Sequence, residues 1–127
     1  MLTSSGARAN VGRSTFDAAV LTHVLCSVSD PAAVLRQAAR ALKPGGTVYV
    51  MEHVLAEAGT ATWYAQQAIA PIFYIVANGC TFRDIAAVLR AAGDGDGLAP
   101  FTIEAVDAPM PIPVVRPHVI ARAVKKA

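Results

Sequence analysis

The stretch that decides the fold runs from FDAAVLT (residues 16–22) through DPAAVLRQAARAL (30–42) and KPGG (43–46) to TVYVMEHV (47–54). The first and last pieces are almost continuously apolar, which is typical of parallel strands covered on both faces. The piece between them repeats apolar residues with a helical period, and Asp30 before Pro31 is a helix-start signal. Strand, helix and strand in this order predict a βαβ unit with parallel strands.

Lysine, proline and two glycines at 43–46 are expected to end the helix at Leu42, because proline cannot continue it and glycine accepts a positive φ. The second strand is then expected over Thr47 to Val54. A second helix is predicted over residues 61–76, with a kink expected at Pro71.

A turn at Asn78–Gly79 precedes a third predicted helix, for which Thr81 and Asp84 are the expected caps. Its buried stripe is expected to consist of Ile85, Val88, Leu89 and Ala92. Beyond a flexible Asp–Gly tract at 94–97, alternating residues at 101–107 and 118–125 predict a late antiparallel pair of strands.

The composition fits one folded domain. The chain has 127 residues, of which 54% are hydrophobic and 16% charged, far from the composition of disordered chains. Residues 1–15 read as a loop and residues 16–127 as the domain. The net charge of +2 and a short basic tail give no nucleic-acid footprint, so a nucleic-acid partner is not expected.

The cellular location is constrained by cysteines and by apolar segments. Cys26 and Cys80 lie far apart without a paired spacing, which suits a reducing compartment, and the first fifteen residues have no signal-peptide core. The most apolar stretch, 61–77, includes two glutamines and a proline and is short for a membrane span, so a buried or membrane-surface helix is expected. The protein is therefore expected to be intracellular, either cytoplasmic or membrane-associated, and not secreted.

A family resemblance rests on the same residues. Phe16–Asp17 opening one strand and Leu42-Lys43-Pro44-Gly45-Gly46 before the next resemble the fourth and fifth strands of class I S-adenosylmethionine-dependent methyltransferases with a methyltransferase type 11 domain. Further matches resemble the methyltransferase-like thiol methyltransferases within this class, namely THVLCSV (22–28), MEHV (51–54), Thr62-Trp63, Gln66-Gln67, Asn78-Gly79-Cys80 and VRPH (115–118). The expected fold is α/β, the carboxyl-terminal half of a Rossmann-like sheet with an antiparallel final strand.

The resemblance implies S-adenosylmethionine as cofactor and a small-molecule thiol as methyl acceptor. The family's glycine-rich cofactor loop and its later acidic residue would both precede residue 16, and neither occurs in this sequence. The first reading is therefore the acceptor-side half of a methyltransferase. The alternatives are a catalytically inactive truncated paralogue that serves as an interaction module and, without positive support, a nucleotide-dependent oxidoreductase of the same layered class.

The candidate site lies at the carboxyl ends of the two parallel strands, where open α/β sheets bind ligands. The resemblance makes Thr22, His23, Val24 and Leu25 a wall beside the cofactor, with core packing as an equally weighted alternative. His23 stands where the family more commonly has an aliphatic residue. His53 is the candidate general base for an acceptor thiol, because histidine titrates near neutrality, and a structural strand-end role is the alternative.

The substrate-binding candidates come from the end of the second strand, from the aromatic residues of the segment that covers the site, and from the last strand. They are Glu52, Trp63, Tyr64, Arg116 and His118, with Phe73 and Tyr74 as further candidates. Cys26 is expected to be an inert buried thiol. His23, Cys26, His53 and Cys80 are metal-ligand residue types, but without paired local spacing no metal site is expected.

The first strand also predicts incompleteness. A strand that is apolar on both faces needs a neighbour on each side, and only one parallel neighbour is available within this sequence. We expect another chain, or a further part of the same sheet, to cover its exposed edge. The remaining expected partners are the methyl acceptor and a membrane surface contacted peripherally.

Overall fold

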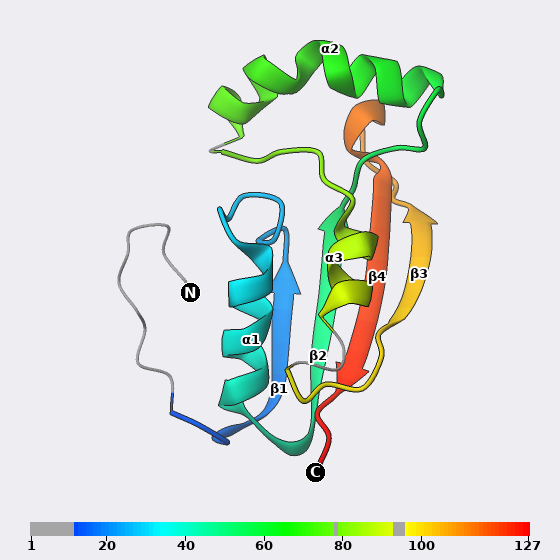
Figure 1. The fold of residues 1–127 in the computed structure, drawn as a ribbon. Helices are drawn as coiled ribbons and strands as arrows, with labels where there is room; N and C mark the ends of the chain where they lie inside the picture. The colour runs from blue at the N-terminus through cyan, green and yellow to red at the C-terminus, as the bar shows by residue number, and fades with distance from the viewer. Residues whose placement is uncertain (1–11, 78, 93–95) are drawn as a thin grey trace.

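The computed structural model describes residues 12–77, 79–92 and 96–127, which form a mixed sheet with helices packed on it (Figure 1). The sheet has the strand order β1-β2-β4-β3. Along the chain the elements are β1 (Phe16–Thr22), α1 (Pro31–Ala41), β2 (Leu42–His53), α2 (Ala61–Val76), α3 (Ile85–Ala91), β3 (Thr102–Asp107), the short 3₁₀ helix η1 (Pro113–Val115) and β4 (Pro117–Val124).

The predicted βαβ unit is confirmed, since β1 and β2 pair in parallel on either side of α1 in sequence. Asp30 caps α1 as expected, and its carboxylate accepts the N–H of Ala33 at 3.0 Å. The expected boundary between helix and strand was wrong. The helix ends at Ala41, and β2 begins at Leu42 instead of Thr47 because Leu42 is already extended and pairs with Phe16.

The glycine tract therefore lies inside β2. It interrupts the pairing register between β1 and β2 and does not mark the start of the strand. Phe16 pairs with Leu42, whereas Ala18 pairs with Thr47, so extra residues bulge out of β2 between these two pairs. Gly45 has a φ of +83°, a conformation that L side chains rarely adopt. The residues that were expected to separate the helix from the strand thus form an irregularity within the strand.

Helix α2 has its predicted bounds, with Thr60 as its cap and Pro71 within it. Helix α3 is capped by Asp84, as expected, whereas Thr81 does not cap it. The hydroxyl of Thr81 instead donates to the carbonyl of Cys26 at 2.8 Å, which ties the loop before α3 to the end of β1. The expected roles of Asn78 and of residues 94 and 95 lie outside the described residues.

The late antiparallel pair is also confirmed, within a residue of its predicted bounds. Strand β4 lies between β3 and β2 and runs antiparallel to both. Its register with β2 pairs His53 with His118. The start of β4 therefore lies at the same edge of the sheet as the ends of β1 and β2.

Both α1 and α3 pack on one face of the sheet (Figure 1). The core between these layers joins apolar residues of the helices to inward side chains of the strands, among them Leu35, Leu89, Val48, Val50 and Val119. The buried stripe expected for α3 is confirmed at Ile85, Leu89 and Ala92, while Val88 is partly buried against the core.

The opposite face of the sheet is bare in the described residues. Its large exposed apolar side chains are Val20, Tyr49, Met51, Ile120 and Val124, and the exposed Thr22, Glu104 and Arg122 lie on the same face. Strands β1 and β3 are the edge strands of the sheet, and Val20 on β1 is 70% exposed. The expectation that β1 is covered on both faces was therefore wrong for this chain, because the helices cover only one side.

Helix α2 lies across the end of the sheet at which β1 and β2 finish (Figure 1). None of the described helices combines the length and the apolar character needed to cross a membrane. Several apolar side chains of α2 nevertheless face outward, with Ile72, Ile75 and Val76 exposed by 66%, 78% and 73%.

Candidate functional site

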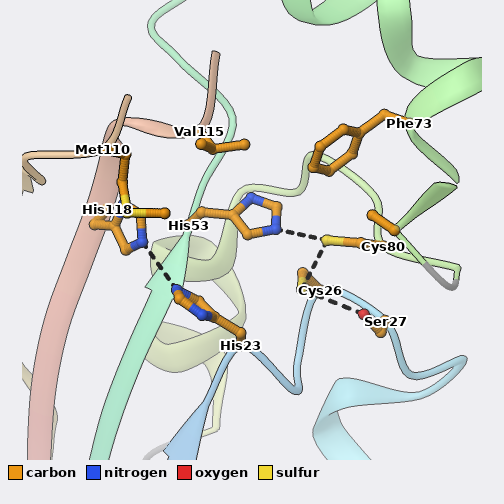
Figure 2. Close-up of a pocket in the computed structure, with 10 residues that line it drawn as sticks. His23, Cys26, Ser27, His53, Phe73, Cys80, Met110, Val115 and His118 are labelled. Carbon is orange, nitrogen blue, oxygen red and sulfur yellow. Dashed lines mark hydrogen bonds between the residues drawn. The ribbon is translucent and has the colours of Figure 1, made fainter. Parts of the chain in front are cut away.

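A cavity of about 260 Å³ opens at the shared edge where β1 and β2 end and β4 begins (Figure 2). Its lining combines imidazoles, thiols and apolar side chains, namely His23, Cys26, Ser27, His53, Phe73, Ala77, Cys80, Met110, Val115 and His118. Three of these groups come from strand ends, and the others come from the loops and from α2. The cavity therefore lies where ligands bind in open parallel sheets.

His23 and His118 form a pair at this edge. Their Nε2 atoms lie 2.9 Å apart, and Nδ1 of His118 lies 3.0 Å from the carbonyl oxygen of Arg116. Because a carbonyl only accepts, Nδ1 of His118 carries a proton, so in the neutral pair His23 donates to Nε2 of His118. The residue is exposed overall, but the partial burial of its ring, followed by the nearby His118, lowers the pKa of His23.

The position of His23 depends on an unusual backbone conformation. Its φ is +52°, in the left-handed region that few residues other than glycine occupy. Its N–H donates to the carbonyl of Met51 at 3.0 Å, which continues the pairing of β1 with β2 by one residue. The chain therefore turns sharply at His23 and carries Cys26 back toward β2.

Cys26, His53 and Cys80 form a buried cluster beside the histidine pair. The sulfur atoms of Cys26 and Cys80 lie 3.0 Å apart, and Nε2 of His53 shares a hydrogen bond with the sulfur of Cys80 (Figure 2). The other ring nitrogen of His53, Nδ1, is buried and has no partner among the described residues. One nitrogen of His53 thus contacts a thiol, and the other can take a proton in the tautomer in which Nε2 donates to the sulfur of Cys80.

The two thiols have different acidities. The hydrogen bond that the two sulfurs share raises the pKa of Cys26 and lowers the pKa of Cys80. Burial adds to the rise at Cys26 and opposes the fall at Cys80. Cys80 is therefore the thiol that loses its proton more readily, and Cys26 is the one that keeps it.

Glu52 holds the turn after β1 in place. Its side chain is fully buried, and Oε1 accepts the backbone N–H groups of Val24 and Leu25 at 2.7 and 2.9 Å. Of the four cofactor-wall residues predicted from the sequence, Thr22 and His23 are exposed, Val24 is half-buried and Leu25 is fully buried in the core. Glu52 positions this segment and is not among the residues that line the cavity.

The predicted acceptor-side residues separate into two groups. His118, Phe73 and the candidate base His53 all line the cavity. Tyr64 is 62% exposed, Trp63 is half-buried on α2, and Arg116 pairs with Asp107 at 2.7 Å; none of these three lines it.

Sequence reasoning missed the gathering of the two cysteines with His53. These residues come from three separate segments, so no local spacing in the sequence indicates that they lie together. The one signal available was that Cys26 and His53 each follow a strand in a parallel pair. Met110, in the proline-rich connection before β4, was also not anticipated as a lining residue.

S-adenosylmethionine fits the described residues in part. Thr22 and His23 are exposed at the end of β1, where the family resemblance would place the cofactor. The cavity itself lies below the range of about 300–1,000 Å³ that is usual for larger ligands, so it suits a small acceptor better than a whole nucleoside. The described residues thus form a small cavity and, at the end of β1, an exposed surface.

Comparisons with known proteins identify relatives of this chain. A family model described as a methyltransferase domain matches residues 4–93. Human thiol S-methyltransferase TMT1A is 35% identical over 116 residues, covering 91% of this chain and 46% of the relative. Human thiol S-methyltransferase TMT1B is 30% identical over 116 residues, covering 87% and 44%. The chain thus spans less than half the length of these curated relatives.

Solved structures show the same fold. A SAM-dependent methyltransferase from Thermotoga maritima, described as a possible histamine N-methyltransferase, superposes with a TM-score of 0.63 at 20% identity, covering 91% of this chain and 59% of that one. Phosphoethanolamine N-methyltransferase 2 of Haemonchus contortus, solved with S-adenosylhomocysteine, gives a TM-score of 0.63 at 14% identity, covering 91% and 35%. The predicted α/β fold, a partial Rossmann-like sheet with an antiparallel last strand, is confirmed.

Proposed function

Because the chain belongs to the methyltransferase domain family, we propose that it is the acceptor-side part of an S-adenosylmethionine-dependent methyltransferase that acts on small-molecule thiols. One observation carries the proposal: a small, mostly apolar cavity lies at the strand ends and contains a buried histidine with an unpartnered ring nitrogen. The names of the human relatives support a thiol as the acceptor. The alternative of an inactive module finds no support in these relatives.

The proposed chemistry needs a thiolate close to an electrophilic methyl group, which S-adenosylmethionine supplies when it is bound. Apolar walls at Phe73, Met110 and Val115 hold the acceptor's carbon chain and exclude water. Nδ1 of His53 takes the thiol proton, because the thiolate is the nucleophile and imidazole titrates near neutrality. His118, oriented by the carbonyl of Arg116, lines the opposite side.

The cofactor side is proposed for Thr22, His23, Val24 and Leu25, of which Leu25 acts through packing alone. Glu52 acts by fixing the backbone of this segment. Trp63, Tyr64 and Arg116 remain proposed acceptor residues only if the segments that carry them move toward the cavity. The proposed setting is intracellular, cytoplasmic or at a membrane surface.

Two further partners are proposed from exposed apolar surface. The exposed face of the sheet and its β1 edge are proposed to be covered by the rest of a methyltransferase sheet or by another chain. The outward side chains of α2 call for peripheral contact with a membrane, because the helix carries no charged residue and exposes several apolar ones.

The first test of the proposal is calorimetric titration of the purified chain with S-adenosylmethionine and S-adenosylhomocysteine, with light scattering to confirm that the sample is not aggregated. Methyl transfer from S-adenosylmethionine is then followed by mass spectrometry with ethanethiol, ethanol and ethylamine as acceptors of matched size. Methylation of ethanethiol alone is the expected result.

Two outcomes would change the proposal, the first in its substrate and the second in what this chain does by itself. If ethylamine or ethanol is methylated in preference to ethanethiol, the thiol assignment is wrong. If a folded, unaggregated sample binds neither cofactor form, the chain alone is not an enzyme, and the same titration is repeated with a longer chain that includes a glycine-rich cofactor loop.

A further inference from the structure

The cluster of Cys26, His53 and Cys80 offers three ligand atoms from three segments of the chain. Cys26 lies in the turn after β1, His53 is the last residue of β2, and Cys80 precedes α3. All three side chains are buried, with exposures of 1%, 6% and 6%, and their ligand atoms lie within 4.8 Å of one another. Figure 2 shows the two sulfurs and the imidazole of His53 converging on one side of the cavity.

The donor set selects a particular class of metal. Two thiolates and one imidazole are ligands for Zn²⁺ and related thiophilic ions, whereas Mg²⁺ and Ca²⁺ require oxygen ligands. Sites with three protein ligands leave a fourth position open for water or substrate, and two cysteines with one histidine is a known set of this kind. We propose that Cys26, His53 and Cys80 bind one Zn²⁺-class ion whose open position faces the acceptor cavity.

The charges and the distances are consistent with such an ion. Two thiolates balance a divalent cation, so the buried site carries no net charge. Bonds of about 2.3 Å in tetrahedral geometry place two sulfur ligands about 3.8 Å apart. The two sulfurs lie 3.0 Å apart in this structure, so binding requires them to separate by less than 1 Å. Both cysteines lie in loops, where such an adjustment disturbs no strand pairing.

The ion also deepens the proposed function, and this second step rests on that function. A thiol that displaces water from the open position breaks its S–H bond, forms a sulfur–metal bond and releases its proton to solvent, with no change in oxidation state. A coordinated thiol is deprotonated outright, so the ion performs the activation otherwise assigned to His53. The neighbouring lining of Ser27, Phe73 and Met110 leaves room for a small acceptor and for little more.

A disulfide between Cys26 and Cys80 is the competing use of the same two sulfurs. Disulfide formation requires an oxidant and removes both thiolates from the donor set. The two uses are mutually exclusive, so the redox state must be held constant in the test.

The test is titration of the full reduced chain with Co²⁺ under anaerobic conditions and in the presence of a phosphine reductant. We expect one Co²⁺ per chain, with intense tetrahedral bands in the visible and a thiolate charge-transfer band in the near ultraviolet, both abolished by Zn²⁺. Cys26→Ser, Cys80→Ser and His53→Gln should each weaken binding at least about tenfold, as loss of a metal ligand or its support does. The matched control, His118→Gln, makes the same change in the same cavity but outside the group of three and should bind Co²⁺ normally.

Circular dichroism shows whether each variant folds. X-ray absorption of the Zn²⁺-loaded wild type gives an answer that depends on no variant, with two sulfur neighbours and at least one nitrogen neighbour expected. A reduced, folded chain that does not bind Co²⁺ overturns the proposal. The proposal is also overturned if a Cys26–Cys80 disulfide is isolated and the chain, once reduced, does not bind Co²⁺. The two cysteines are then a redox pair.

Adding ethanethiol to the Co²⁺-loaded chain tests the second step. A shifted charge-transfer band and a third sulfur neighbour are expected. An unchanged spectrum restricts the ion to a structural role and overturns the thiol step alone. These measurements need no S-adenosylmethionine, so a failure of methyl transfer does not affect them. If a chain that binds no ion still transfers methyl groups to thiols, the metal inference is wrong and the proposed function is supported.

Discussion

The carboxylate of Glu52 accepts the backbone N–H of Leu25 at 2.9 Å, although the two residues are 27 positions apart in sequence. The same oxygen accepts the N–H of Val24, so one side chain of β2 satisfies two donors that the end of β1 leaves unpaired. This contact fixes the turn that carries Cys26 into the cavity. Glu52 therefore acts on the site from within the core.

Replacing Glu52 by leucine should lower the free energy of unfolding by about 2–4 kcal/mol. The reason is that the buried N–H of Leu25 and the partly buried N–H of Val24 lose their acceptor, and an unsatisfied buried group costs about 1–3 kcal/mol. Glu52→Gln keeps an acceptor oxygen and should cost less. Urea denaturation followed by circular dichroism measures both variants.

The matched control is Glu104→Leu, at an exposed position of β3, which should change stability by about 0.5 kcal/mol or less. Equal losses in the free energy of unfolding for the Glu52 and Glu104 variants would show that the contact from Glu52 to Leu25 does not stabilise the fold.

Local patterns predicted the elements whose ends are marked in the sequence. The bounds of β1 and α2 were predicted as found, because an apolar run meets polar or turn residues at each end. The start of β2 was misplaced because proline and glycine normally end an element, and the sequence does not reveal that a pairing with Phe16 extends the strand beyond them.

The candidate site was predicted only at the level of strand ends. His53 was identified because ligands bind at the carboxyl ends of parallel strands, and His118 as a polar residue of the predicted last strand. Their pairing at one edge is seen only in the structure. The convergence of Cys80 on Cys26 was not predicted, since 54 residues separate them and a loop between two helices brings Cys80 back. Separations of this size leave no periodic or spaced pattern in a sequence.

His53→Gln should lower the rate of thiol methyl transfer by about 10²-fold or more, because the acceptor thiol then loses its general base. The variant is assayed with ethanethiol over a range of pH, in whichever form of the protein binds the cofactor. At high pH, where ethanethiol ionises unaided, the difference from wild type should shrink. Ser29→Ala, an exposed change away from the cavity, serves as the control. A deficit that stays constant with pH would exclude a role for His53 in taking the proton.

Stability should fall as the pH decreases below the ordinary histidine range, in part because of His23. Burial and His118 lower the pKa of His23 in the folded state, so the unfolded chain takes up its proton first. The stabilising contribution of neutral His23 is therefore complete above a pH of about 6.5 and is lost as the pH falls toward the lower folded-state pKa.

His23→Gln should accordingly show a smaller drop in Tm than wild type between about pH 7 and pH 5 at constant ionic strength. Thermal unfolding by calorimetry gives the slope. The control Ser29→Gln, at a nearby exposed position, should retain the slope of wild type. A His23→Gln slope as steep as that of wild type would mean that other groups carry the acid sensitivity.

The outward face of α2 should bind lipid vesicles even when they carry no net charge. Helix α2 has no charged side chain, and Ile72 and Ile75 are 66% and 78% exposed, so attraction comes from apolar burial and should depend little on salt. Ile72→Glu combined with Ile75→Glu should abolish co-sedimentation with phosphatidylcholine vesicles. Val20→Glu adds a charge to an exposed apolar residue of the sheet and should leave vesicle binding intact. Binding that survives the double change would place the lipid contact elsewhere.

The bare face of the sheet should make the isolated chain associate with itself. Tyr49 pairs with Val20 of β1, and Met51 pairs with Ile120 of β4, so exposed apolar side chains of neighbouring strands lie side by side near the β1 edge. Arg122 and Thr22, the other partners of Tyr49 and Met51, border this apolar surface. Sedimentation velocity should show a mass that rises with concentration, and Val20→Lys with Met51→Lys should shift it toward the monomer. Gln37→Lys on the exposed side of α1 adds the same charge without touching this surface and should not. A wild-type chain that stays monomeric at every concentration would show that the exposed face needs no partner.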